Sequence, residues 1–284
     1  MAGSLSIDMN RSVMTTSDAQ REPIIEIRDL VTHYGDRKVI DGLNLTVYQG
    51  EIMALMGFSG SGKTTLFRQM LGLKKPTSGT IRILGKDITT LGNREMYELR
   101  RHMGVAFQGG ALFSSLTVAE NVELPLREHT RLDDNTIRIM SRLKLEVVNL
   151  SGSENLKPSE LSGGMVKRVA LARALIMDPR LMFFDEPSAG LDPIVSAELD
   201  ELIIQLRDAL KMTIVVITHE LHSAFKIADR IAILDNGEIL VTGTVDEVRN
   251  CTDPRVQNML NRKPRDQAID ADAYLKRLTG ANPP

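Results

Sequence analysis

A glycine-rich segment, Gly57–Thr65, has the residue types and spacing of a phosphate-binding loop. It fits the pattern G-x-x-x-x-G-K-[ST], and the apolar run Ile52–Met56 before it has the length of a strand. A chance glycine-rich turn is the alternative, which the strand-like run disfavours. The residues expected around the phosphates are Gly57, Phe58, Ser59, Gly60, Ser61, Gly62, Lys63, Thr64 and Thr65.

The chemistry of such a loop is anion binding. Glycines let backbone N–H groups turn toward phosphate oxygens, and the start of the following helix adds positive potential. Lys63 would neutralise the β- and γ-phosphates, and the Thr64 hydroxyl would bind Mg²⁺. The segment therefore predicts a nucleotide-binding protein.

Two acids, Asp185 and Glu186, directly follow the apolar run Leu181–Phe184. A buried strand delivers such carboxylates to the sheet edge at which a phosphate loop also opens. Asp185 is suited to holding Mg²⁺, directly or through water, and Glu186 to orienting and deprotonating an attacking water. A helix cap is the alternative for adjacent acids. With a phosphate loop in the same chain, the pattern favours nucleotide hydrolysis.

A second segment, Leu161–Met165, also predicts a phosphate-binding helix start. Ser162, Gly163 and Gly164 precede a helical stretch at 166–176. One phosphate loop holds one nucleotide, so the second phosphate-binding site has no nucleotide of its own in the same chain. The economical solution is that it faces a nucleotide held by another copy of the chain.

The elements that must position these groups alternate between strands and helices. Such alternation predicts an α/β fold with a mostly parallel sheet, preceded by a small antiparallel β subdomain. Asn236-Gly237 predicts a hairpin. The expected strands are 24–31, 43–47, 52–56, 80–84, 105–107, 181–184, 213–217, 231–234 and 238–241, with helices after the phosphate loop and at 166–177, 193–210 and 220–228.

One domain is expected over residues 23–250, with an inserted helical subdomain at about 110–178. Helix-like spacing predicts the insertion, and its apolar positions are Leu132, Ile137, Met140, Leu143 and Val147. Residues 1–22 are polar and are expected to be disordered. Residues 251–284 form a tail that is either solvated or docks onto a neighbour. The docking residues would be Val256, Met259, Leu260, Tyr274, Leu275 and Leu278.

Composition excludes several classes of protein. The chain of 284 residues is 42% hydrophobic and 25% charged, which is ordinary for a globular protein. A net charge of −2 gives no reason to expect nucleic acid as a partner. The single cysteine, Cys251, excludes an intrachain disulfide and suits a reducing cytoplasm. No apolar run reaches the roughly 18 residues of a transmembrane helix, and no signal peptide is evident at the N-terminus.

Over about residues 24–241 the chain resembles the ATP-binding subunits of ABC transporters, which are P-loop NTPases. Gly57–Thr64 corresponds to Walker A, Leu181–Glu186 to Walker B, Leu161–Met165 to the signature and 188–192 to the D-loop. The resemblance implies that ATP, with Mg²⁺, lies between Walker A of one copy and the signature of a second in a head-to-tail homodimer.

The resemblance also assigns four single residues. Gln108 would bind Mg²⁺ and sense the attacking water, and His219 would hold the γ-phosphate. Tyr34 would stack on adenine, and Asp192 would link the two sites. Alone, Gln108 could equally cap a strand and His219 lie free at the surface. Met165 departs from the glutamine usual in signatures, which implies weaker polar anchoring without loss of activity.

Two further segments, 107–113 and 121–130, are similar to the Mkl branch that serves MCE-type lipid transporters. ATPases of phospholipid systems in Gram-negative envelopes are the nearest likeness. This implies a permease, an MCE-domain protein, a STAS-domain protein and a peripheral location on the cytoplasmic face of the inner membrane. Phe113 and Leu116 would contact the permease, or else belong to the core of the helical subdomain.

Three other functions stay open. An amino-acid-type importer ATPase would carry similar motifs with a different permease. A soluble ABC ATPase in DNA repair or translation is disfavoured by the single nucleotide-binding domain and the missing basic patch. A regulatory switch without turnover is disfavoured by Glu186, because degenerate sites usually lose that carboxylate.

Overall fold

Six strands form the central sheet, in the order β10-β9-β3-β8-β7-β6, in a computed structural model that describes residues 21–263. Neighbouring strands are parallel except β9 and β10, which run antiparallel. The Asn236-Gly237 turn between them has positive φ at both residues, which confirms the predicted hairpin. The bounds are β3 Ile52–Gly57, β6 Met103–Ala106, β7 Leu181–Asp185, β8 Thr213–Ile217, β9 Arg230–Asp235 and β10 Glu238–Thr244.

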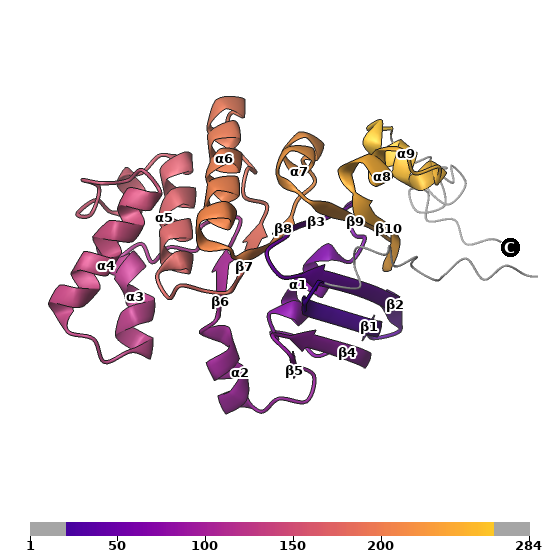
Figure 1. Ribbon diagram of the computed structural model, residues 1–284, viewed down its shortest axis with the longest axis horizontal. Helices are drawn as coiled ribbons and strands as arrows, with labels where there is room; N and C mark the ends of the chain where they lie inside the picture. The colour runs from indigo at the N-terminus through magenta and orange to yellow at the C-terminus, as the bar shows by residue number, and fades with distance from the viewer. Residues whose placement is uncertain (1–20, 264–284) are drawn as a thin grey trace, which may run out of the picture.

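Helices cover both faces of this sheet (Figure 1), and the inner strands carry long runs of buried apolar residues. In β7, Leu181 and Phe183 pack with α1 (Lys63–Met70), whereas Met182 and Phe184 pack with α6 (Pro193–Leu210). This alternation buries every side chain of the run, because successive residues of a strand point to opposite faces. The position of α7 (Leu221–Ile227) beside α6 completes that helical layer.

A smaller antiparallel sheet of order β2-β1-β4-β5 packs on the other side of α1, as the sequence predicts. Its strands are β1 Pro23–Tyr34, β2 Arg37–Tyr48, β4 Ser78–Ile83 and β5 Lys86–Asp87. The side chains of Leu66, Phe67 and Met70 share one core with both sheets. The helix that follows the phosphate loop is therefore clamped between two sheets.

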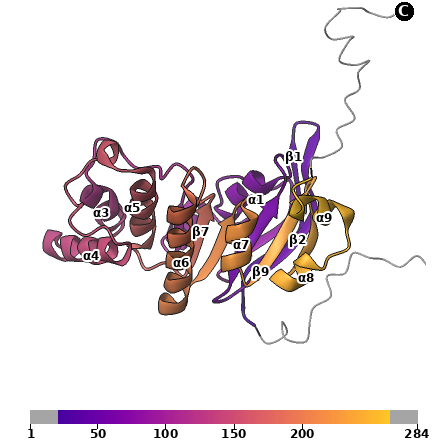
Figure 2. The same cartoon turned by 90° about the horizontal axis from the view of Figure 1, so that it is seen from above.

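Three helices form a lobe beside the sheets, at the position of the predicted insertion (Figures 1 and 2). They are α3 Val118–His129, α4 Asp134–Val147 and α5 Gly163–Leu175, and α2 Asn93–Arg100 precedes them. Thr117 and Asp133 start α3 and α4 by accepting hydrogen bonds from backbone N–H groups of the first turn.

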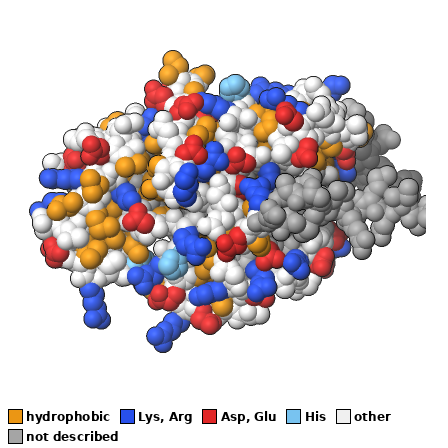
Figure 3. Space-filling view, viewed as in Figure 1, with side chains coloured by type: hydrophobic (Ala, Val, Ile, Leu, Met, Phe, Trp, Pro, Cys, Tyr) orange, Lys and Arg blue, Asp and Glu red, His pale blue; other side chains and the backbone are white. Residues whose placement is uncertain are grey.

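The apolar face expected in this lobe is right at two of its five positions. Ile137 is buried and Met140 packs against the core, but Leu132, Leu143 and Val147 are exposed. Asp133 caps a new helix, so the periodicity does not continue across it, and Leu132 lies in the connection. Hydrophobic side chains are accordingly visible on the surface of the lobe in Figure 3.

The C-terminal part of the described chain packs on its own domain. Helices α8 (Val245–Arg249) and α9 (Pro254–Leu260) lie against β9, and Val256 is completely buried there. Docking of Val256 and Met259 onto a neighbour is therefore wrong, because these side chains are buried in a core within the chain. Leu260 is only partly buried against that core, and its docking stays a prediction. The other docking residues, Tyr274, Leu275 and Leu278, lie outside the described residues, as does the predicted disordered segment up to residue 20.

Within residues 21–263, no helix has both the length and the apolar character needed to cross a membrane.

Candidate nucleotide site

The phosphate loop connects the end of β3 to the start of α1, and two glycines make its path possible. At Gly57, with φ 155°, an added Cβ would lie 2.3 Å from the carbonyl oxygen of Leu234 on the neighbouring strand. At Gly62, with φ 110°, a Cβ would lie 3.1 Å from the carbonyl oxygen of Val39. Only glycine tolerates this backbone at such close approach. The loop is thus wedged between β9 and β2.

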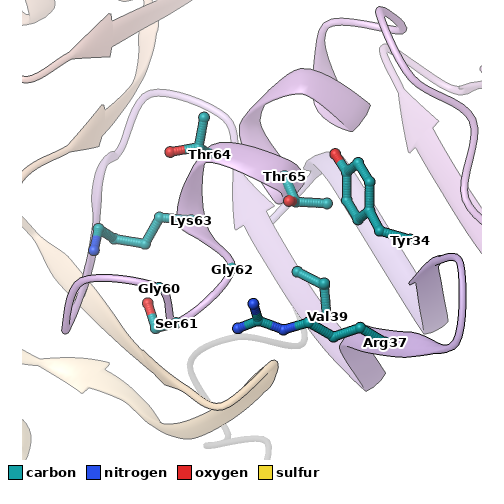
Figure 4. Close-up of a pocket in the computed structure, with 9 residues that line it drawn as sticks. All are labelled: Tyr34, Arg37, Val39, Gly60, Ser61, Gly62, Lys63, Thr64 and Thr65. Atoms are coloured by element: carbon teal, nitrogen blue, oxygen red, sulfur yellow. The ribbon is translucent and has the colours of Figure 1, made fainter. Parts of the chain in front are cut away.

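A cavity of about 300 Å³ opens beside this loop, a volume at the lower end for small-molecule sites. Tyr34 and Lys63 lie at opposite ends of it in Figure 4. The lining residues are Tyr34, Arg37, Val39, Gly60, Ser61, Gly62, Lys63, Thr64 and Thr65. An aromatic ring at one end and a phosphate loop at the other match the base and the phosphates of a nucleotide.

The Lys63 ammonium folds back over the loop. Its Nζ donates to the carbonyl oxygens of Gly57 at 2.7 Å and Phe58 at 3.0 Å. Burial lowers the pKa of Lys63, and the charge of Glu186 opposes this. The ammonium is therefore held near the loop backbone and within the electrostatic reach of Glu186, which follows β7.

Tyr34 is half exposed, and the Lys74 ammonium lies 2.8 Å from the centroid of its ring. Hydrogen bonds from Lys74 and Thr65 lower the pKa of the Tyr34 hydroxyl. Cations on the face of a tyrosine ring are attracted by its quadrupole. Arg37 extends toward the phosphate loop from β2 (Figure 4). Sequence analysis missed Arg37 and Val39, although both follow Tyr34 closely enough for one turn to bring them to the same cavity.

The acid pair, Asp185 and Glu186, stands at the carboxyl end of β7. Burial, followed by the charge of Glu186, raises the pKa of Asp185, and Lys167 and Arg68 oppose the shift. Glu186 adopts a left-handed φ of 50°, and its N–H donates to the carbonyl oxygen of Ile217 at 2.8 Å. A strained residue persists only where its surroundings fix it, and such strain is concentrated at functional sites.

The structure brings Glu186 and His219 together. Oε1 of Glu186 lies 2.9 Å from Nδ1 of His219, and the His219 backbone N–H donates to Oε2 at 3.4 Å. The side chain of Glu186 is only 14% exposed and that of His219 is 61% exposed. His219 therefore faces outward while fixing the carboxylate behind it.

Gln108 follows β6, the strand that pairs with β7, so it stands at the same sheet edge as the acid pair. Its backbone carbonyl accepts a hydrogen bond from Lys167. Arg173 donates to the carbonyl oxygens of Gly110 and Ala111, both at 2.7 Å. Sequence analysis missed Lys167 and Arg173, because basic residues in an Ala/Leu-rich helix carry no signal for backbone contacts 59 to 63 residues away.

The signature segment Leu161–Met165 starts α5. Ser162 is the N-cap, and its Oγ accepts from the Met165 N–H at 3.3 Å. Gly164 lies close to α6, since an added Cβ would lie 2.8 Å from Cγ1 of Val195 and the valine side chain would have to shift. The Met165 side chain packs against the core shared by α5 and α6.

The signature segment does not line the cavity beside the phosphate loop of the same chain. Ser162 lies in the helical lobe, whereas Lys63 lies between the two sheets (Figure 1). Asp192 caps α6, accepting from the N–H groups of Ile194 and Val195 at 3.0 Å each. The site that the sequence predicts is therefore divided between two regions of one chain, as a head-to-tail pair would require.

The residues near the phosphate loop fit a magnesium ion that is coordinated partly by the protein and partly by the phosphates of a nucleotide. Mg²⁺ prefers oxygen ligands and usually takes only one or two carboxylates from the protein. The Asp185 carboxylate and Thr64 hydroxyl would supply such oxygens. Burial and then the charge of Glu186 raise the pKa of Asp185, and a bound cation would oppose both effects. No cluster of three or more acids, histidines or cysteines within residues 21–263 offers a complete metal site.

Comparisons with known proteins agree with this geometry. The family model described as ABC transporter matches residues 40–189. The chain is 45% identical to the "Intermembrane phospholipid transport system ATP-binding protein MlaF" of Haemophilus influenzae, over 90% of this chain and 98% of that protein. It is 38% identical to the "Probable ribonucleotide transport ATP-binding protein mkl" of Mycobacterium bovis, over 84% of this chain and 66% of that protein.

Among solved structures, the fold matches the ATP-binding cassette MJ0796 in a dimeric post-hydrolysis state bound to ADP and Pi. The TM-score is 0.72 at 31% identity, and the match covers 78% of this chain and 98% of that one. The P-loop fold with its added β subdomain and helical lobe is thereby confirmed. Taken together, the motifs, the fold and these relatives show that the chain belongs to the ABC transporter family, as an ATP-binding subunit of the Mkl/Mla-type branch.

Proposed function

We propose that this chain is the ATP-hydrolysing subunit of a transporter that moves phospholipid across a Gram-negative cell envelope. The observation that carries the proposal is its 45% identity to the phospholipid transport protein of Haemophilus influenzae over 98% of that protein. The match spans almost the whole relative and therefore includes the regions outside the nucleotide motifs as well as the motifs themselves.

Within the site, we assign each role to a residue of this chain. Tyr34 stacks on adenine, and the phosphate loop with Lys63 binds the phosphates. Thr64, Asp185 and Gln108 hold Mg²⁺, which supplies charge neutralisation on the phosphates. Glu186 orients and deprotonates the attacking water, and His219 fixes the Glu186 carboxylate and contacts the γ-phosphate.

The second half of the site comes from a second copy. Ser162, Gly163 and Gly164 of that copy present a helix N-terminus to the phosphates, and Asp192 links the two sites. ATP favours the closed dimer because it contacts both copies, and hydrolysis removes those differential contacts. Closure of the dimer is the mechanical output delivered to the permease.

The remaining partners follow from the phospholipid assignment. They are an integral membrane permease, an MCE-domain protein and a STAS-domain protein, and the complex places this chain on the cytoplasmic face of the inner membrane. Phe113 is 53% exposed at the end of the Gln108 segment, which makes it available to a permease.

Purification of the native complex tests this function. An affinity tag on the full chain, expressed at its natural level, should recover a permease, an MCE-domain protein and bound phospholipid from detergent-extracted membranes. A Lys63→Ala chain is the control for assembly without nucleotide binding. Recovery of a solute-binding protein without phospholipid would favour an amino-acid-type importer, and recovery of ribosomes or DNA would favour a soluble ATPase.

A further inference from the structure

Lys167, five residues into the signature helix from its N-cap Ser162, reaches two segments of the nucleotide site at once. Its ammonium donates to the backbone carbonyl of Gln108 and, at 3.2 Å, to that of Glu186. These two residues follow different strands, β6 and β7, whereas the lysine belongs to α5. One side chain thus joins the segment expected to sense the attacking water to the residue expected to deprotonate it.

The electrostatic setting of Lys167 favours this bridge. The side chain is half buried, and burial lowers its pKa while the charges of Asp185 and Glu186 raise it. A partly desolvated ammonium near two acids loses hydration and needs strong acceptors. The two carbonyl oxygens supply those acceptors and hold the ammonium between the two segments.

The two segments that Lys167 contacts each contain a residue with a left-handed backbone conformation. Glu186 has φ 50°, and Ala111, three residues after Gln108, has φ 49°. Both conformations are unfavourable for residues with a side chain and persist only when neighbouring groups fix them. Arg173, almost two turns further along α5, fixes the carbonyls of Gly110 and Ala111. Helix α5 therefore contacts the segment after Gln108 through two residues, Lys167 and Arg173, and contacts Glu186 through Lys167 alone.

We propose that Lys167 is a positioning residue for ATP hydrolysis. It fixes Gln108 and Glu186 relative to each other and connects both to the helix that begins after Ser162. This proposal rests on the ATPase function proposed above and extends it. The consequence is mechanical, because α5 presents Ser162 to the nucleotide of the second copy. A displacement of α5 on dimer closure therefore moves the hydrolytic residues of its own chain through Lys167.

Two substitutions separate this role from simple packing. Lys167→Met keeps the length of the side chain and removes the donors, whereas Lys167→Arg keeps charge and several N–H donors. Lys144→Met is the matched control. Lys144 lies on α4 of the same lobe and pairs with the carboxylate of Asp178 at 2.5 Å.

We expect the full-length Lys167→Met chain to lose at least about tenfold in kcat with KM for ATP changed less than about twofold, because misplacement of catalytic groups slows the chemical step. Lys167→Arg should stay within about threefold of the wild-type kcat, since arginine can donate to the same two carbonyls. Amide hydrogen exchange should accelerate in Lys167→Met over residues 107–111 and 185–189, and in neither segment of Lys144→Met.

An unchanged kcat in Lys167→Met, or a rise in KM with kcat preserved, would overturn the positioning role. So would an equal loss in Lys144→Met, which would indicate damage to the lobe as a whole. If the Met variant unfolds, the Arg variant decides alone, because a tenfold loss of kcat in a folded Lys167→Arg chain contradicts the proposal. A wild-type chain that binds ATP without turnover would overturn the proposed function itself.

Discussion

Nδ1 of His219 lies 2.9 Å from Oε1 of Glu186, although the two residues are separated by 33 positions in the sequence. The contact exists because β7 and β8 are parallel neighbours whose carboxyl ends meet at one edge of the sheet. Glu186 follows β7 and His219 follows β8 at that edge. The pair fixes the orientation of the carboxylate that we assign as the general base.

Glu186→Gln should abolish most turnover while leaving ATP bound. The amide keeps the size of the side chain but cannot accept a proton, and loss of a general base costs about 10²- to 10⁴-fold in rate. We therefore expect trapped ATP and accumulation of the closed dimer, measured by ATPase assay and size-exclusion chromatography with ATP. Turnover at the wild-type rate would assign the base to another residue.

Lys63→Ala should lose ATP binding. The ammonium is the charged group held over the phosphate loop, and a charge-assisted hydrogen bond contributes about 1.5–3 kcal/mol. Affinity should fall by at least about tenfold in a nucleotide-binding titration. Lys86→Ala, which changes an exposed lysine on β5, is the control and should bind normally. Full affinity in Lys63→Ala would remove the phosphate-loop assignment.

Gly57→Ala should destabilise the fold more than Gly60→Ala. Both glycines have positive φ, but a Cβ at Gly60 meets nothing within 4 Å, whereas one at Gly57 would lie 2.3 Å from the carbonyl oxygen of Leu234. The strained backbone alone should cost about 1–2 kcal/mol at Gly60. The added clash should bring Gly57→Ala to about 3 kcal/mol or more, as measured by urea unfolding. Equal losses would show that close approach to β9 is unimportant.

Asp200→Asn should change how stability depends on pH. Asp200 is buried on α6, and its carboxylate accepts from the Ser223 hydroxyl on α7 at 2.5 Å. Burial raises the pKa of Asp200 above its unfolded value of about 3.9. The folded chain therefore binds more protons than the unfolded one in this window, and stability falls as pH rises from about 4 through the folded pKa.

The asparagine keeps an acceptor for Ser223 and cannot ionise, so the variant should lack this fall. Urea unfolding at several pH values from about 4 to 7 would measure it. Asp208→Asn, which removes an exposed carboxylate from the same helix, is the control. Parallel stability curves for Asp200→Asn and the wild type would contradict the assigned cost of burying Asp200.

The elements that the sequence predicted well are those with strong local patterns. The apolar run of β7 and the Asn236-Gly237 turn each depend on residues close together in the chain. Helix α2 was not predicted, because only Met96 and Leu99 of its eight residues are buried and the periodic signal is weak. The face of α4 was partly wrong, because the buried side of this helix runs through Ile137, Ser141 and Leu145, and Leu143 lies off that side.

The sequence by itself determined the family and the residue types at the nucleotide site, since each motif is a run of neighbours. Only the tertiary structure decided which distant residues meet, because strand order and helix packing set those pairs. It joined Glu186 to His219, placed Lys167 on two carbonyls, and enclosed Val256 in a core of its own chain. It also separated Ser162 from the phosphate loop, so one folded chain presents two halves of different sites.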